Sequence, residues 1–227
     1  MNRCVWILWV IAALSAGCSG EDVEIKGKIQ HLEGKVVLSV FSPESNDTLV
    51  VAEQMVELGD VNFTVSNLKI PARLWMSWGK KGQIEFIVDH RKGTFLKGDA
   101  LYPDSIKIEG SDLEKEYTFV YGILQEKYDV PMNKLDSAIR SMKNRGELSG
   151  GEKEALAFYQ KRREHYGRCR ELFVRRMVES NPEQNLSLFL IWDELQDSTD
   201  VQRSLFEKMQ VRNKKSNVYR LLSAKLK

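Results

Sequence analysis

Cysteine and histidine are scarce in this chain of 227 residues, which contains three of each. Cys4 and Cys18 lie within or directly after the first hydrophobic segment, so only Cys169 remains in the rest of the sequence. A single cysteine cannot form an internal disulfide, a CxxC redox pair or a cysteine-rich zinc site. The histidines are His31, His90 and His165. We expect none of them to share a metal ion with another histidine or a cysteine, and we predict no metal site and no cofactor.

Motifs of common enzyme classes are also missing. The sequence has no GxSxG, no GxxxxGK[ST], no GxGxxG after a predicted strand and no HExxH. Glu53 with Glu57 and Asp193 with Glu194 are close in sequence, but we expect both pairs on the surface. The 34 basic residues nearly balance the 32 acidic ones, which gives no indication of a nucleic-acid partner. The sequence therefore predicts a protein without enzymatic activity.

The one long hydrophobic run occupies residues 5–14 and follows Arg3. It is too short for a membrane-spanning helix, which needs about 20 apolar residues. A basic start followed by a short apolar segment is typical of a secretory signal peptide. Small residues at positions 15–17 then precede Cys18.

This order resembles the lipobox of bacterial lipoproteins, in which the cysteine receives a diacylglyceryl group and a further acyl chain. Ser15 stands where leucine is usual. We predict a signal peptide at residues 1–17 and a lipidated tether at residues 18–22, with Cys18 as the lipidation site, because more than one acyl chain is enough to hold a protein on a bilayer. The alternative is a plain secretory signal with an unmodified cysteine.

Ser19 follows the cysteine, where aspartate would indicate inner-membrane retention in some Gram-negative bacteria. We therefore predict lipid-anchored localisation at the outer membrane, facing the periplasm or exposed on the surface. The acidic pair at residues 21–22 also resembles the export signal of surface-displayed lipoproteins.

Apolar residues alternate with polar ones between residues 23 and 110, which predicts about eight short strands. Turn residues such as those at 43–47 and 59–60 separate the strands. This spacing is typical of a sandwich or barrel-like module. We predict an α+β fold, with an antiparallel β-sandwich or barrel-like domain at residues 23–110 followed by an α-helical region at residues 111–227.

The helical region shows apolar residues at helical spacing. We predict helices at about 113–128, 132–142, 149–180, 186–195, 201–209 and 218–226. Pro131 is expected to separate the first two. Tyr159, Tyr166 and Phe173 are seven residues apart on the longest helix, which predicts a stripe packed against a partner. Cys169 lies on the same stripe, and we expect it to be buried rather than reactive.

Short motifs in a fixed order extend from residue 23 to residue 117. They are IKGKI, GKVVLSV, DTLVV, GDVNFTV, IPARLW, IEFIVDHRKGTFLKGD and IKIEGSDLEKEY. The order resembles the N-terminal domain of unknown function of bacterial lipoproteins that end in a thioredoxin-like domain. In that family this region is non-catalytic and the redox cysteines lie in the later domain. No CxxC follows in this sequence, so we do not carry redox activity over to it.

Two features of the strand-rich half are candidate surface sites. Trp75 and Trp78 are a candidate ligand surface, since aromatic faces can stack on sugar rings. Three residues apart on a strand, they face opposite sides, so we expect at least one in the core. Asp47-Thr48-Leu49 resembles the acceptor motif of bacterial protein O-glycosylation, which makes Thr48 a candidate modification site.

Seven basic residues lie between positions 161 and 176. Glutamates are interleaved with them at spacings of three or four, which predicts charge pairs on a solvated helix face. Anionic lipid headgroups or surface polysaccharide are the alternative partners for this run.

The leading hypothesis is a non-enzymatic outer-membrane lipoprotein with a binding or scaffolding role, attached to the membrane through its lipid anchor. The alternative is an accessory of an extracytoplasmic thiol–disulfide redox system that docks on a separate thioredoxin-like protein through its helices. The predicted partners are such an envelope protein or a polysaccharide.

Overall fold

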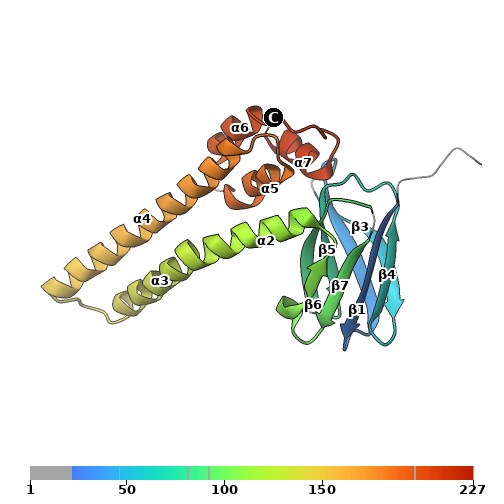
Figure 1. Cartoon of the computed structure of the whole chain (residues 1–227). Helices are drawn as coiled ribbons and strands as arrows, with labels where there is room; N and C mark the ends of the chain where they lie inside the picture. Colours follow the sequence, from blue (N-terminus) through green and yellow to red (C-terminus); the bar gives the residue numbers. More distant parts are fainter. Residues whose placement is uncertain (1–21, 46, 81, 92, 197, 227) are drawn as a thin grey trace, which may run out of the picture. The chain divides into compact units, whose positions relative to one another are not determined.

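The structure is a computed structural model that describes residues 22–45, 47–80, 82–91, 93–196 and 198–226. The predicted signal peptide and Cys18 therefore lie outside the described residues. The chain divides into two compact units, one ending at Ser111 and the other beginning at Asp112, and each is described by itself. Strands form the first unit and helices the second, which confirms the predicted α+β class (Figure 1).

The first unit is built from two four-stranded sheets. The strands are β1 (Val23–Gln30), β2 (Gly34–Ser42), β3 (Asp47–Val56), β4 (Asp60–Val65), β5 (Ala72–Trp78), β6 (Gly82–Val88), β7 (Thr94–Asp99) and β8 (Lys107–Glu109), with a 3₁₀ turn, η1 (Pro103–Ser105), before β8. One sheet has the order β4-β1-β7-β8 and the other β3-β2-β5-β6. All neighbouring strands are antiparallel except β1 and β7, which are parallel. The predicted sandwich is therefore confirmed, with one parallel pair that was not predicted; β7 joins β1 only after the chain has built all four strands of the other sheet.

Alternating side chains from both sheets fill a single core between them. Ile25 and Ile29 of β1 and Leu74 and Met76 of β5 are fully buried in it. Each such side chain contributes roughly 1.5–3 kcal/mol relative to an exposed one. The residues between them point outward, which is the period-two pattern that the sequence shows.

Two glycines are required by close approach of the backbone. A methyl group on Gly27 would overlap the carbonyl oxygen of Leu96 on β7, and one on Gly59 would overlap that of Ile29. Gly59 also has a φ of 77°, a conformation that side chains disfavour. The absence of a side chain at these positions allows β1 to lie tightly between β4 and β7.

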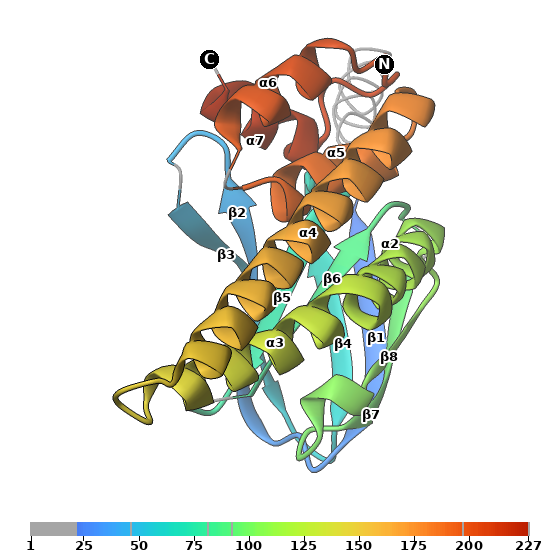
Figure 2. The ribbon, with the colours of Figure 1, turned by 90° about the vertical axis from the view of Figure 1, so that its left-hand side faces the viewer.

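The second unit contains six α-helices and one π-helical turn among its described residues. They are α2 (Asp112–Leu124), η2 (Gln125–Asp129, the π turn), α3 (Val130–Lys143), α4 (Gly150–Ser180), α5 (Asn185–Glu194), α6 (Thr199–Glu207) and α7 (Asn217–Lys225). Figure 2 shows α4 running beside α3. Ser149 begins α4 with a capping box, in which its hydroxyl accepts a hydrogen bond from the Glu152 N–H and the Glu152 carboxylate accepts one from the Ser149 N–H. The hydrogen bond from the Ser149 backbone is the main cause that lowers the pKa of Glu152.

Pro131 does not end the first helix, which corrects the prediction that the helix stops before it. The chain stays helical from α2 through η2 into α3, and the N–H of Val130 bonds to the carbonyl of Gln125. A proline in a regular helix loses one hydrogen bond and collides with the carbonyl four residues earlier. The wider π turn removes that conflict, since Pro131 falls in the first turn of the next α-helical segment.

Aromatic and charged side chains join α4 to the helix before it. The ring of Phe173 lies 6.0 Å from that of Tyr128 between centroids, so this residue of the predicted stripe does face a partner helix. Arg163 on α4 reaches Asp136 on α3 at 3.2 Å. Of the basic run, Arg175 makes the expected pair on its own helix, with Glu171 at 3.6 Å. The prediction of pairs along one solvated face is thus only partly correct, because other arginines reach across to neighbouring helices.

Arg170 makes the densest polar contact of the helical unit. Its guanidinium donates to Asp129 at 2.8 Å and to Glu194 at 2.6 Å, and so joins α4 to the π turn and to α5. Gln125 donates to Asp129 and the Tyr117 hydroxyl donates to Glu194, at 2.9 and 3.2 Å. Burial alone would lower the pKa of Arg170, but the hydrogen bonds to the two carboxylates outweigh it and raise the pKa above its ordinary value. This arginine therefore stays charged where three helical segments meet.

Alanine substitutions at Gly27 and Gly122 should change the stability in opposite directions, because a methyl group has no room at Gly27 and open space at Gly122. Gly27→Ala should lower the free energy of unfolding by about 2 kcal/mol, because the new methyl group forces β1 and β7 apart. Gly122→Ala should raise the stability of the helical unit by about 1 kcal/mol, because Gly122 lies exposed in α2 with open space around it. Urea unfolding followed by circular dichroism measures both. An unchanged Gly27→Ala protein would contradict the close approach.

Arg170→Met should destabilise the helical unit by about 2 kcal/mol or more, because two largely buried carboxylates lose their common counter-charge while the side-chain stem is kept. Arg175→Met is the matched control, since its exposed pair should contribute less than about 0.5 kcal/mol. Urea unfolding monitored at 222 nm compares the two. An equal loss of unfolding free energy in both variants would contradict a larger stabilising role for the Arg170 contacts.

Candidate functional site

The outer surface of the sheet β4-β1-β7-β8 carries the main candidate site. An open hollow of about 490 Å³ lies on it, lined by residues of β1, β4, β7 and β8. We call this surface the lysine face and define it by Lys26, Lys28, Lys97, Lys107 and Phe95. All five belong to strands of the first unit.

Strand register brings these side chains together. Lys28 on β1 lies opposite Lys97 on β7, and Lys97 lies opposite Lys107 on β8. The next row contains Lys26 opposite Phe95. Side chains two residues apart on a strand share a face, and neighbouring strands are roughly 4.8 Å apart, so the lysines form a compact group.

The positive charges of this group are only partly compensated. Lys28 pairs with Asp60 at 2.7 Å and Lys26 with Glu24 at 2.6 Å. Lys97 and Lys107 make no ion pair with any residue that the structure describes. Like charges directly opposite one another destabilise a sheet. An anion bound beside Lys97 and Lys107 would relieve this repulsion.

Phe95 adds an aromatic surface to the lysines. Its side chain is 49 % exposed, on the outward side of β7. Asn62 and Glu109 line the same hollow and provide an amide and a carboxylate. The surface can therefore stack against a flat apolar ligand face, donate to anions and exchange hydrogen bonds with hydroxyl groups.

One end of the β1–β7 pair is fixed by Asp99. Its carboxylate accepts hydrogen bonds from the Leu101 N–H and from His31, each at 2.9 Å. The bond from Leu101 is the largest cause that lowers the pKa of Asp99, followed by the contact with His31. Asp99 therefore ties the turn after β1 to the end of β7 and helps to hold the register of the lysine face.

The sequence analysis did not identify the lysine face. The outward positions of Lys26 and Lys28 follow from period two, but the pairing of β1 with β7 joins residues about 70 positions apart. Nothing local in the sequence indicates a parallel pair at that separation. The alternation of Lys26 with Lys28 in the first predicted strand was the available signal.

Trp75 and Trp78 do not form a joint platform. Trp78 is 8 % exposed and belongs to the core, as expected for one of the two. Trp75 points to the other face of β5, where its indole N–H donates to Glu85 at 3.1 Å. Only Trp75 could contact a ligand on that face.

Thr48 lies exposed at the start of β3, and its N–H donates to the Asp47 carboxylate at 2.7 Å. Its hydroxyl is accessible, so O-glycosylation there stays a prediction. The lipidation of Cys18 falls outside the described residues and also stays a prediction.

Cys169 is half-exposed, which corrects the expectation that it is buried. Its Sγ lies 3.6 Å from Nε2 of His165. The two residues are four positions apart on α4, the spacing of helical neighbours. Cysteine and histidine at metal-ligand spacing were therefore overlooked in the sequence, although a pair alone supplies fewer ligands than a structural zinc site needs. In the part of the chain that the structure describes, no group of three His, Cys, Asp or Glu side chains is arranged to hold a metal ion.

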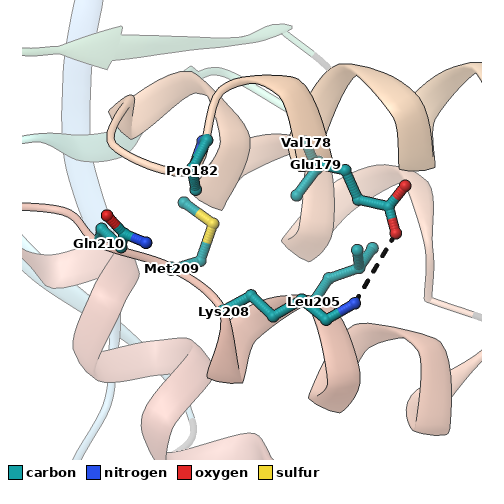
Figure 3. Close-up of a pocket in the computed structure, with 7 residues that line it drawn as sticks. All are labelled: Val178, Glu179, Pro182, Leu205, Lys208, Met209 and Gln210. Atoms are coloured by element: carbon teal, nitrogen blue, oxygen red, sulfur yellow. Dashed lines mark ion pairs between the residues drawn. The ribbon is translucent and has the colours of Figure 1, made fainter.

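The helical unit contains a smaller pocket of about 340 Å³, shown in Figure 3. Val178, Pro182, Leu205 and Met209 give it apolar walls. An ion pair between Glu179 and Lys208 at 3.9 Å lies at its edge (Figure 3). This composition suits the packing of an apolar group and offers little for acid–base chemistry.

Comparison of the chain with models of protein families, with curated proteins and with solved structures found no match. Across the described residues, no helix has the length and apolar character needed to span a bilayer. The functional argument therefore depends on the chain's own residues.

Proposed function

We propose that this protein is a non-enzymatic lipoprotein of the cell envelope, anchored at the outer membrane through Cys18, with a binding or scaffolding role. The sequence supports the anchor, because a basic start, a short apolar segment and small residues precede the cysteine. Acyl chains attached there would keep both units at the membrane surface.

The lysine face supports the binding role. It is an open surface whose lysines, aromatic ring and hydrogen-bonding groups come from all four strands of one sheet. Large or extended ligands fit open surfaces, whereas small substrates are usually enclosed in clefts that bury most of their area. This single feature favours the recognition of an extended ligand.

Cys18→Ala should move the protein from the outer-membrane fraction to the soluble periplasmic or signal-retained pool, because the acyl anchor can no longer be attached. Sucrose-gradient fractionation and mass spectrometry of the N-terminal peptide measure this. The matched control is Cys169→Ala, which removes the thiol of the helical unit and should leave fractionation unchanged. A wild-type protein that keeps an unmodified, uncleaved N-terminus would refute the anchor.

A second candidate function is that of an accessory to an extracytoplasmic thiol–disulfide system. It is favoured by the half-exposed Cys169 thiol beside His165, and it agrees with the resemblance of residues 23–117 to the N-terminal domain of thioredoxin-like lipoproteins. In this proposal the helical unit docks on a separate thioredoxin-like protein that supplies the redox cysteines.

Cys169 of the wild-type chain is first converted to a mixed disulfide with an aromatic thiol, by reaction with the corresponding aromatic disulfide. A thioredoxin-like envelope protein whose second CxxC cysteine is replaced by serine should then attack the Cys169 sulfur with its remaining thiolate, form a mixed disulfide with the chain and release the aromatic thiolate. Cys169→Ser should abolish the cross-link, because Cys169 is the only cysteine left as a thiol once the signal peptide is removed and Cys18 is acylated. Non-reducing gel electrophoresis followed by mass spectrometry of the linked peptides is the measurement. Cross-linking that survives in Cys169→Ser, or none in the wild type, would remove this candidate.

A further inference from the structure

We propose that the lysine face binds an acidic glycan, with its carboxylate groups at Lys97 and Lys107 and a sugar ring stacked on Phe95. This proposal rests on the proposed function for its setting, since an anchored envelope protein meets polysaccharides outside the cytoplasm. It goes further because it names the ligand class and the side chains that recognise it.

Charge is the first argument. Lys28, Lys97 and Lys107 stand in one row across three neighbouring strands, and only Lys28 has an acidic partner among the residues that the structure describes. Two ammonium groups therefore lie side by side without an ion-pair partner among the described residues, and the carboxylate of Glu109 lies one row away. Lysine ammonium groups are compact charges with three donors each, which suits monodentate contacts to carboxylates.

The mixture of groups is the second argument, and it favours a glycan over an anionic lipid surface. A bilayer presents closely spaced negative charges, which Asp60 and Glu109 at the same hollow would repel. An acidic glycan carries hydroxyl groups beside its carboxylates, and these hydroxyl groups can donate to Asp60, Glu109 and the Asn62 amide oxygen. The two acidic residues can thus accept hydrogen bonds from a glycan, whereas they would repel an anionic membrane surface.

The position of Phe95 is the third argument. Its half-exposed ring lies one row from Lys97 on the same strand and directly opposite Lys26 and Glu109. An aromatic ring surrounded by charged side chains has little packing reason to be exposed on a strand. A sugar ring stacked on it would have the Lys26 ammonium on one side and the Glu109 carboxylate on the other, with Lys97 one row away, so both its charged and its hydroxyl substituents would have partners.

Polygalacturonate is a suitable probe, since every ring carries a carboxylate, and its methyl ester is the neutral counterpart. The full-length protein, purified in a non-ionic detergent, should bind polygalacturonate in isothermal titration calorimetry and bind the methyl ester at least about tenfold more weakly. The binding should weaken as sodium chloride is raised, because salt screens exposed charges.

Lys97→Ala with Lys107→Ala should weaken polygalacturonate binding by about tenfold or more, since two charge-assisted contacts are lost. The matched control is Lys69→Ala with Lys80→Ala, which removes the same charge from exposed positions elsewhere in the sandwich. Phe95→Ala should also weaken binding, by about fivefold, while Tyr102→Ala, which removes another exposed ring of this unit, should not. Thermal unfolding of each variant checks that the fold is kept.

Three results would overturn the proposal. The first is equal binding of polygalacturonate and its methyl ester. The second is equal loss in the lysine-face variants and in their controls. The third is binding to detergent micelles that contain phosphatidylglycerol, lost in Lys97→Ala with Lys107→Ala, without any binding of polygalacturonate. Each would leave the fractionation of the wild-type protein unaffected, so failure of this proposal is distinguishable from failure of the anchor.

Discussion

The close packing of β1 between β4 and β7 is the constraint on which the sandwich depends. β1 pairs antiparallel with one neighbour and parallel with the other, and Gly27 permits the approach to Leu96 that this position demands. The inward residues of β1 anchor the core, and its outward residues supply two of the four lysines of the lysine face. Stability and the candidate ligand surface therefore depend on the same strand, through alternate side chains.

The two units reach their stability in different ways. The sandwich uses pairings that are distant in sequence and a continuous apolar core. In the helical unit, α3 has no fully buried side chain among its described residues, and charged contacts across helices take a larger share. Arg170 supplies the counter-charge for the π turn, because its guanidinium pairs with the carboxylate of Asp129, the last residue of that turn. The π turn lets the helix continue past Pro131, and Arg170 pairs with the carboxylate at the end of that turn.

Much of the fold follows from local pattern. Period two predicted about eight strands between residues 23 and 110, where the structure has eight, and helical spacing predicted the six α-helices, because burial on one side imposes these periods. Two features of the fold were not predicted. The parallel β1–β7 pair cannot be deduced from strand pattern, and Pro131 was expected to break a helix because its compensation by a π turn has no clear sequence signal. Trp78 was foreseeable as core from its spacing, whereas the exposure of Cys169 depended on the direction in which α4 faces.

The lysine face shows why a candidate site can escape sequence analysis although each of its residues is visible there. A lysine at an edge or outward position of a strand ordinarily keeps the protein soluble, because its charge discourages pairing with the strands of other chains. The case is different when neighbouring strands place further lysines directly opposite. Repulsion between the unpaired charges then destabilises the sheet, and solubility alone does not require such an arrangement. Register, and not composition, produces this situation: the chain is nearly neutral overall, yet Lys97 and Lys107 face each other without an acidic partner among the described residues. A surface that is unfavourable for the isolated fold and favourable for an anionic ligand is the physical signature expected of a binding site.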